Sequence, residues 1–166
     1  MKYIIRQADE KDLNAILEIV NYNILNTTSI YDYEPRTLAQ QKAIFEEKVS
    51  ADFPLLVIEI ENKIAGFGTY GTFRFKEGYK FTVEHSVYVS INHQGKGLGK
   101  LLLAELIELA KKQKLHTMIA VIDSENQNSV EFHKQFGFET VGIMKESGFK
   151  FNKWLDTVFM QLLLKS

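Results

Sequence analysis

A chain of 166 residues with 45% hydrophobic content predicts one domain, residues 1–166, built around one substantial core. The net charge of −1 excludes a global basic field for nucleic acid, and no apolar run is long enough to cross a bilayer, so we expect a soluble, cytoplasmic protein with a small-molecule partner. The absence of cysteine excludes disulfides, thiolate metal sites and acyl transfer through a cysteine intermediate.

Alternating and helical patterns divide the chain into strands and helices. Runs rich in β-branched and aromatic residues predict strands, and apolar residues at helical spacing predict helices. Asp9 and Thr37 can cap helix N-termini, while residues 31–35 form an aromatic and acidic loop that is a candidate wall for a substrate site. No repeat or low-complexity linker interrupts the series, so we expect one α/β (α+β) domain with a mixed sheet flanked by helices. In chain order we expect a strand at 3–6, a helix after Asp9, a helix from Thr37 to about residue 50, strands at 55–60, 64–73 and 81–89, a helix opening at 98, a strand at 117–122, a helix at 126–136, and strands at 139–144 and 154–164.

Residues 94–100, with the sequence Gln-Gly-Lys-Gly-Leu-Gly-Lys, connect a predicted strand to an amphipathic helix. Glycine lets N–H groups approach an anion, and the first turn of a helix offers unpaired N–H donors and the positive end of its dipole. Lys100 stands where a dinucleotide fingerprint needs its last glycine, and Leu101 where a P-loop needs Ser or Thr, so both nucleotide motifs fail. The loop alone predicts an anion site, with a glycine-rich turn that binds nothing as the alternative.

Three ordered segments together resemble the GNAT acetyltransferase superfamily: the strand at 84–89, the Q-x-x-G-x-G pattern at 94–99, and Asn126 followed by the Phe-Gly-Phe segment at 136–138. A narrower resemblance, to the phosphinothricin and methionine sulfoximine/sulfone acetyltransferases, covers nearly the whole chain. The resemblance implies a central mixed sheet split into a V, with acetyl-CoA in the V and the acceptor entering from the other side. The narrower resemblance is carried by residues 26–28, 82–89, 148–150 and 154–156.

The resemblance also implies which residues hold the donor. The backbone of Val87, Tyr88 and Val89 would bond the pantetheine and the acetyl carbonyl, because a splayed strand leaves N–H and C=O groups free to pair with an extended arm. A backbone N–H aimed at the thioester oxygen stabilises the charge that develops there. Asn126 matches a cofactor contact of the family, and the alternative from sequence is a helix cap. The pyrophosphate is assigned to Gly95, Lys96, Gly97, Leu98, Gly99 and Lys100.

Glu84 is the predicted base at the acceptor end. A free α-amine is mostly protonated at pH 7 and must lose a proton before it attacks, so the site needs a group that accepts one directly or through water. The ordinary pKa of a glutamate is about 4.3, so we expect partial burial in the cleft to raise the pKa of Glu84. The alternatives are a simple counter-ion for the ammonium and an exposed strand carboxylate without a role.

Arg74 is the predicted partner for the carboxylate of an amino-acid acceptor, because guanidinium binds carboxylate in a planar two-bond fork. A hairpin centred near residues 76–78 would place four side chains on one face by strand alternation, those of Arg74, Lys80, Thr82 and Glu84. The alternative is a cross-strand ion pair between Arg74 and Glu84 on a solvated face. The resemblance marks two acceptor-binding segments, which are Arg74, Phe75 and Lys76, and Glu84, His85 and Ser86.

The four histidines show no metal-ligand spacing, so we expect no metal. His133 stands where many GNAT enzymes have the tyrosine that protonates the departing thiolate, so it is the candidate general acid, although a thiolate scarcely requires one. His85 alternates away from Glu84, and the sequence leaves open whether it lies in the core or in the site. We expect His93 and His116 at the surface.

These observations predict direct transfer of acetyl from acetyl-CoA to the α-amine of a small free amino acid or analogue, of the phosphinothricin or methionine sulfoximine type. Two alternatives stay open: acetylation of a protein N-terminus, which offers Arg74 no nearby carboxylate, and a catalytically silent acyl-CoA-binding protein. Nucleic-acid binding is disfavoured because no basic stripe is interleaved with aromatics. The resemblance also implies a homodimer, with residues 157–164 or the loop at Tyr79 as candidate contacts.

Overall fold

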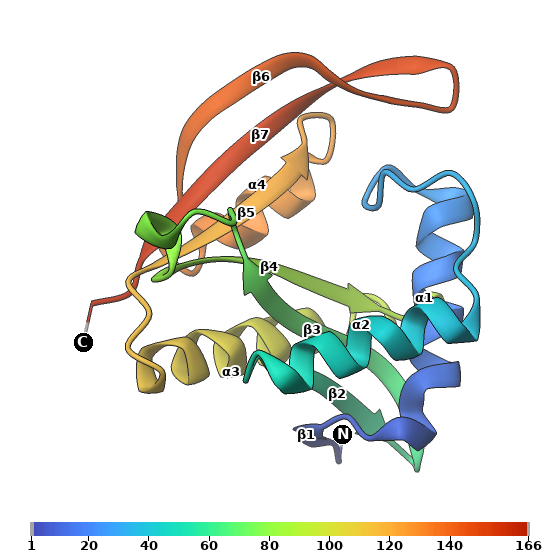
Figure 1. Ribbon diagram of the computed structural model, residues 1–166. Coiled ribbons are helices and arrows are strands. Elements are labelled where there is room, and N and C mark those ends of the chain that lie inside the picture. Colours follow the sequence, from blue (N-terminus) through green and yellow to red (C-terminus); the bar gives the residue numbers. More distant parts are fainter. Residues whose placement is uncertain (1, 166) are drawn as a thin grey trace.

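A single seven-stranded sheet organises the fold, in the spatial order β1-β2-β3-β4-β5-β7-β6 (Figure 1). The computed structural model describes residues 2–165. The order of elements along the chain is the order predicted from sequence. The strands are β1 (Ile4–Gln7), β2 (Leu55–Ile60), β3 (Lys63–Thr72), β4 (Thr82–Val89), β5 (Thr117–Asp123), β6 (Glu139–Lys150) and β7 (Lys153–Leu163). The helices are α1 (Leu13–Asn26), α2 (Leu38–Ser50), α3 (Leu98–Lys112) and α4 (Gln127–Lys134), with 3₁₀ turns η1 (Glu10–Asp12), η2 (Glu77–Tyr79) and η3 (Ile91–His93).

The sheet splits between β4 and β5, the parallel pair at its centre. Their pairing covers three positions, Thr82 with Thr117, Val83 with Met118, and Glu84 with Ile119, and then stops. Beyond this point β4 pairs with β3 on its other side alone, and β5 pairs with β7 (Figure 1). The expected V is therefore present, and it leaves two strand edges without a neighbour in the described part of the chain.

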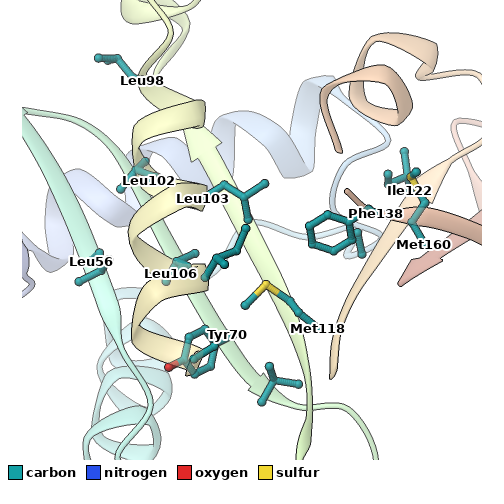
Figure 2. Packing of buried hydrophobic residues seen from close by; sticks show 14 of the residues in the cluster. Leu56, Tyr70, Leu98, Leu102, Leu103, Leu106, Met118, Ile122, Phe138 and Met160 are labelled. Carbon is teal, nitrogen blue, oxygen red and sulfur yellow. The ribbon is translucent and has the colours of Figure 1, made fainter. Parts of the chain in front are cut away.

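Two cores cover the two faces of the sheet. The leucines of α3 pack on one face beside Tyr70 and Met118, which come from β3 and β5 (Figure 2). The apolar side of α1 packs on the other face against Val57 and Phe67. Each fully buried leucine stabilises the fold by roughly 1.5–3 kcal/mol, so these cores hold the strands rigidly around the split. The buried leucines of α3 are Leu98, Leu102, Leu103 and Leu106.

The helix starts follow the capping side chains. Thr37 and Gln40 form a capping box at the start of α2, in which Thr37 Oγ1 accepts from the Gln40 N–H at 3.2 Å and Gln40 Oε1 accepts from the Thr37 N–H at 2.8 Å. Asp9 also caps, but it caps the 3₁₀ turn η1, so α1 begins one turn later. The helix expected at 126–136 is shorter, because Asn126 is its cap and the chain leaves the helix after Lys134.

The closing hairpin differs most from its prediction, because β6 continues to Lys150 instead of ending at residue 144. Glu146 adopts a positive φ of 48°, and the register with β7 shifts between Met144 and Gly148, so the strand resumes after this irregularity. The turn itself lies at Phe151 and Asn152, both at positive φ. The long hairpin extends above the rest of the sheet (Figure 1). Within residues 2–165, no helix is both long and apolar enough to span a membrane.

Candidate active site

A cavity of about 690 Å³ opens where β4 and β5 part. Both splayed strands contribute to its wall, and α4 and the loop after α1 complete it. Polar and apolar residues therefore line the same cavity, as is typical of a small-molecule site. The lining includes Asn23, Thr28, Ser29, Ile30, Tyr31, Glu84, His85, Ser86, Val87, Tyr88, Val89, Gln94, Gly99, Ala120, Val121, Ile122, Asp123, Asn126, Asn128, Ser129, Phe132 and His133.

The glycine loop lines a second hollow of about 480 Å³ that adjoins this cavity and shares Val89, Gln94, Gly99 and Phe132 with it. Gly95 and Gly97 have φ of 75° and 76°, the left-handed conformation that favours glycine, and a Cβ at either position would meet nothing within 4 Å. Gly97 is the N-cap of α3 and brings no side-chain cap. The Lys100 N–H donates to the Gly97 carbonyl at 3.1 Å, so the N–H groups of Leu98 and Gly99 are the ones left for an anion.

The glycine loop carries two lysines, and Lys100 also lines the second hollow. Lys96 and Lys100 are both exposed, and the ammonium of Lys96 donates to the Asn92 carbonyl at 3.4 Å. Lys100 belongs to the first turn of α3, beside the uncapped N-terminus. Both charges are thus free to add to the attraction for a phosphate.

Glu84 lies half-buried at the point where the β4–β5 pairing ends. Burial raises the pKa of Glu84, and the positive charges of Lys48 and Arg74 oppose that rise. Ser86 and Tyr88 follow Glu84 on the same face of β4, since side chains alternate along a strand. The Tyr88 ring packs on Phe67 at 5.3 Å between centroids, so this face looks toward α1 and the loop that follows it.

The loop between β3 and β4 carries Arg74, Phe75 and Lys76, and these residues do not line the cavity. The expected alternation is wrong, because Gly71 lies opposite Glu84 and β3 ends at Thr72, before Arg74. Arg74 is exposed, with its guanidinium 5.2 Å from the Phe73 ring. Phe75 is 95% exposed. In residues 2–165 Arg74 and Glu84 form no ion pair, so the cross-strand pair is not observed.

His85 and His133 form a buried pair on the other face of β4, and both line the cavity. Their Nε2 atoms lie 3.1 Å apart, and His133 Nδ1 lies 2.6 Å from the Ser129 carbonyl oxygen. Because that carbonyl only accepts, Nδ1 of His133 carries a proton, so neutral His133 accepts at Nε2 from His85. Burial lowers the pKa of His133 and, with His133 nearby, lowers that of His85 to about 3. The sequence left the position of His85 open, and the structure places it in both the core and the site.

Asn126 is the helix cap that the sequence allowed, and its contact with the cofactor stays a prediction. Its Oδ1 accepts from the Ser129 N–H at 3.1 Å, which makes it the N-cap of α4, and its side chain also lines the cavity. Of the other histidines, His116 is exposed as expected, whereas His93 is half-buried beside the glycine loop.

A family model described as an acetyltransferase (GNAT) domain matches residues 5–159 of this chain. The chain belongs to the GNAT acetyltransferase family. It is 44% identical to the L-methionine sulfoximine/L-methionine sulfone acetyltransferase of Pseudomonas paraeruginosa, over 99% of this chain and 96% of that protein. Its fold matches the phosphinothricin acetyltransferase of Sinorhizobium meliloti in complex with AcCoA (36% identity, TM-score 0.95, 98% of this chain and 89% of the other). It also matches the ribosomal-protein-alanine N-acetyltransferase of Brucella melitensis (42% identity, TM-score 0.95, 96% and 99%).

Membership in the GNAT family confirms three predictions made from sequence: the fold, an acyltransferase activity, and acetyl-CoA as the acetyl donor. The free edge of β4 and the uncapped start of α3 fit that donor, since they offer backbone groups to an extended arm and to phosphates. No group of three or more His, Asp or Glu residues able to hold a metal ion is found between residues 2 and 165.

The contacts that hold one wall of the cleft were not predicted, although residues 26–28 and 148–150 belong to the segments that carry the narrower resemblance. The loop after α1 is fastened over the cavity, because Thr28 donates to Asp123 on β5 and the buried ammonium of Lys150 donates to the carbonyls of Thr27, at 2.8 Å, and Ile30. The sequence indicated a substrate wall at 31–35, and Tyr31 does line the cavity. The contacts that hold the wall span about a hundred residues or more along the chain, so no local pattern reveals them.

Proposed function

We propose that this enzyme transfers acetyl from acetyl-CoA to the α-amine of a small free amino acid or amino-acid analogue, such as methionine sulfoximine or phosphinothricin. The observation that carries the proposal is Glu84, a half-buried carboxylate that faces the cavity where the sheet splits. An ammonium is attracted to it, and the raised pKa of Glu84 makes it a better proton acceptor than an ordinary glutamate. The activities for which the similar enzymes are named support the same substrate class.

We assign the donor to the glycine loop and the free edge of β4. The backbone of Val87, Tyr88 and Val89 would pair with the pantetheine, residues 95–100 would hold the pyrophosphate, and Asn126 would contact the arm from the start of α4. Acetyl-CoA supplies an activated acyl group with a thiolate leaving group. The N–C bond forms as the C–S bond breaks, and the proton lost by the amine passes to Glu84, directly or through water.

For the acceptor we assign Arg74, with Phe75 and Lys76, to the carboxylate end and Glu84, His85 and Ser86 to the amine end. Arg74 does not line the cavity, but its charge is close enough to Glu84 to oppose the rise in the pKa of Glu84. His133 is our candidate for protonating the thiolate. Its lowered pKa means that little imidazolium is present at neutral pH to donate a proton, and a thiolate leaves without much help.

The test is an acceptor scan that measures release of the CoA thiol, which has low background because the chain contains no cysteine. Free amino acids, sulfoximines, sulfones and phosphinates should react, and the matching amides and peptides should react poorly. Arg74→Ala should raise KM for an amino acid far more than for its amide. Preference for a peptide N-terminus would instead support the activity named for the Brucella melitensis protein, and binding of acetyl-CoA without turnover of any amine would support a silent binding protein.

We also propose that the chain works as a cytoplasmic homodimer. The strand β6 lies at the edge of the sheet and exposes Val141, Ile143 and Met144, whereas the candidate strand at 157–164 lies mostly between β5 and β6. Edge strands with apolar side chains are usually covered, and a second copy is the simplest cover. Sedimentation of the wild type should give a dimer, and Ile143→Glu should give a monomer of unchanged helix content. A monomeric wild type would contradict the proposal.

A further inference from the structure

Lys48 of α2 reaches across the sheet face and ends over Gly71 of β3. Its ammonium donates to the Tyr70 carbonyl at 2.9 Å. A Cβ built on Gly71 would lie 2.5 Å from that nitrogen, so the ammonium occupies the space that any side chain at position 71 would take. The glycine thus makes room for a cation that comes from a different element.

Gly71 is the residue directly opposite Glu84 in the β3–β4 ladder. Side chains opposite one another in an antiparallel pair have Cβ atoms about 4.5–5.5 Å apart and point to the same face. The ammonium of Lys48 therefore stands in for the cross-strand neighbour of Glu84. The two charges act on each other: Lys48 opposes the rise in the pKa of Glu84, and Glu84 opposes the fall that burial causes in the pKa of Lys48.

Lys48 is acted on by the negative charge of the adjacent Glu47 first and by that of Glu84 second. Among residues 2–165 it forms no ion pair, and its one hydrogen bond goes to a neutral carbonyl. The charged and titratable groups around Glu84 are Lys48 from α2, with Glu47 next to it, Arg74 from the loop after β3, and Tyr88 on β4 itself. Of the two cations, Arg74 is assigned to the carboxylate of the acceptor. Lys48 is then the cation that still acts on Glu84 when the acceptor is bound.

We propose that Lys48 is a positioning residue for the transfer reaction: its ammonium, seated in the space left by Gly71, keeps the half-buried Glu84 ionised so that it can take the proton of the acceptor. This inference rests on the proposed role of Glu84. A base must be deprotonated before the reaction, and burial alone would favour the protonated carboxyl. Lys48 offsets that effect without occupying the cavity.

Two variants and one matched control test the inference. Lys48→Met removes the charge, and Gly71→Ala keeps the charge but displaces the ammonium, at little cost because the end of a lysine is flexible. Lys42→Met removes an exposed lysine of the same helix that pairs with Glu10. The readouts are the pKa of the Glu84 carboxyl in the free protein, measured by carbon NMR with Glu84→Gln for assignment, and the pH profile of kcat/KM.

Lys48→Met should raise the pKa of Glu84 and move the acid limb of kcat/KM to higher pH, with a loss of about three- to tenfold on the acid side and little loss above the limb. Gly71→Ala should shift the pKa of Glu84 and the acid limb of kcat/KM in the same direction as Lys48→Met, but by a smaller amount. In the variant that combines both substitutions, Gly71→Ala should cause no further shift. Lys42→Met should change neither. An unchanged pKa of Glu84 in Lys48→Met, or an equal loss of activity at every pH, would overturn the inference.

The two proposals fail in different ways. If Glu84→Gln keeps full activity, Glu84 is not the base and the proposed role falls, whereas the NMR measurement still reports whether Lys48 acts on the carboxyl. If Glu84→Gln is inactive and Lys48→Met leaves the pKa of Glu84 unchanged, only the role of Lys48 falls. Should Lys48→Met fail to fold, Gly71→Ala, which retains every charge, decides the question alone.

Discussion

At the scale of single residues, Glu84 combines a cost in stability with a gain in function. Burial raises the pKa of Glu84 above its value in the unfolded chain, so the folded state holds this proton more tightly and loses stability as pH rises through that window. Glu84→Gln removes the buried charge. We expect a Tm at pH 7 equal to or above that of the wild type, together with a kcat reduced by about 10²- to 10⁴-fold.

The measurements for Glu84→Gln are a thermal melt and steady-state kinetics at pH 7, with acetyl-CoA binding followed by calorimetry. Binding of the donor should be kept, since Glu84 lies on the acceptor side of β4. The wild-type kcat/KM should fall on acidification with an apparent pKa above that of an ordinary glutamate. A Tm well below the wild type, or kinetics within twofold of it, would contradict the role assigned to this side chain.

The buried pair of His85 and His133 predicts acid-sensitive stability. The pKa of His85 is about 3 in the folded protein against 6.5 for an ordinary histidine, so the unfolded chain binds the extra proton as pH falls below 6.5. Stability should therefore be full above that value and decline toward pH 3, by up to about 1.4 kcal/mol per pH unit for one proton. His85→Gln cannot titrate but keeps a donor for His133, so urea unfolding at pH 7 and pH 5 should differ less for the variant. An equal loss of unfolding free energy between pH 7 and pH 5 in the wild type and in the variant would show that another group is responsible.

Residue positions were predictable where one strand carried them. Glu84, Ser86 and the backbone of residues 87–89 lie on the cavity because strand alternation and the end of one ladder place them there. Lys48 gave no signal, since a lysine on an amphipathic helix looks the same whether it is solvated or folded over a glycine of a distant strand. Arg74 was misplaced in the alternation because β3 ends two residues before it, and alternation has no meaning in a loop.

At the scale of elements, the glycine loop needs glycine at position 97 for its backbone conformation and not because a side chain would lack room. Gly97 has a positive φ, and a Cβ there would touch nothing, so Gly97→Ala should cost about 1 kcal/mol from the left-handed conformation and should not disturb the core. Gly97 also lines the second hollow, where we assign the pyrophosphate, so the same methyl group would take space from that ligand. We expect a higher KM for acetyl-CoA, by about tenfold, with kcat nearly unchanged.

The matched control is Gly78→Ala. Gly78 also faces open space, but it has no positive φ, belongs to η2 and lines neither the cavity nor the second hollow. The control substitution should leave the KM for acetyl-CoA as in the wild type. If the two substitutions change the KM for acetyl-CoA equally, the assignment of the pyrophosphate to this loop is wrong. If Gly97→Ala changes stability alone, the loop is a structural turn without a role in binding.

At the scale of the whole molecule, sequence patterns predicted the order of the elements and the two closing strands, but not the full length of β6 or the contacts of the closing hairpin. Periodicity is local, and each strand of the sheet is long enough to show it. The irregularity at Glu146 resembles a turn in sequence, so β6 was expected to end early, and the contacts of Lys150 with the loop after α1 join segments 120 or more residues apart. The V came from the resemblance, because no pattern within β4 or β5 says how far two strands stay paired.

The open V also predicts how the donor stabilises the chain. An arm that pairs with the free edge of β4 and a pyrophosphate held by α3 tie together parts of the fold that the split leaves apart, so acetyl-CoA should raise Tm. At one hundred times its Kd, binding contributes about 2.7 kcal/mol, or roughly 5–11 °C for a chain of this length. Acetyl-pantetheine lacks the pyrophosphate, so at the same concentration it should raise Tm much less. In Gly97→Ala, the difference between the Tm increases caused by the two ligands should be smaller than in the wild type. Equal shifts from both ligands in the wild type would assign the binding energy to β4 alone and leave the glycine loop without a ligand.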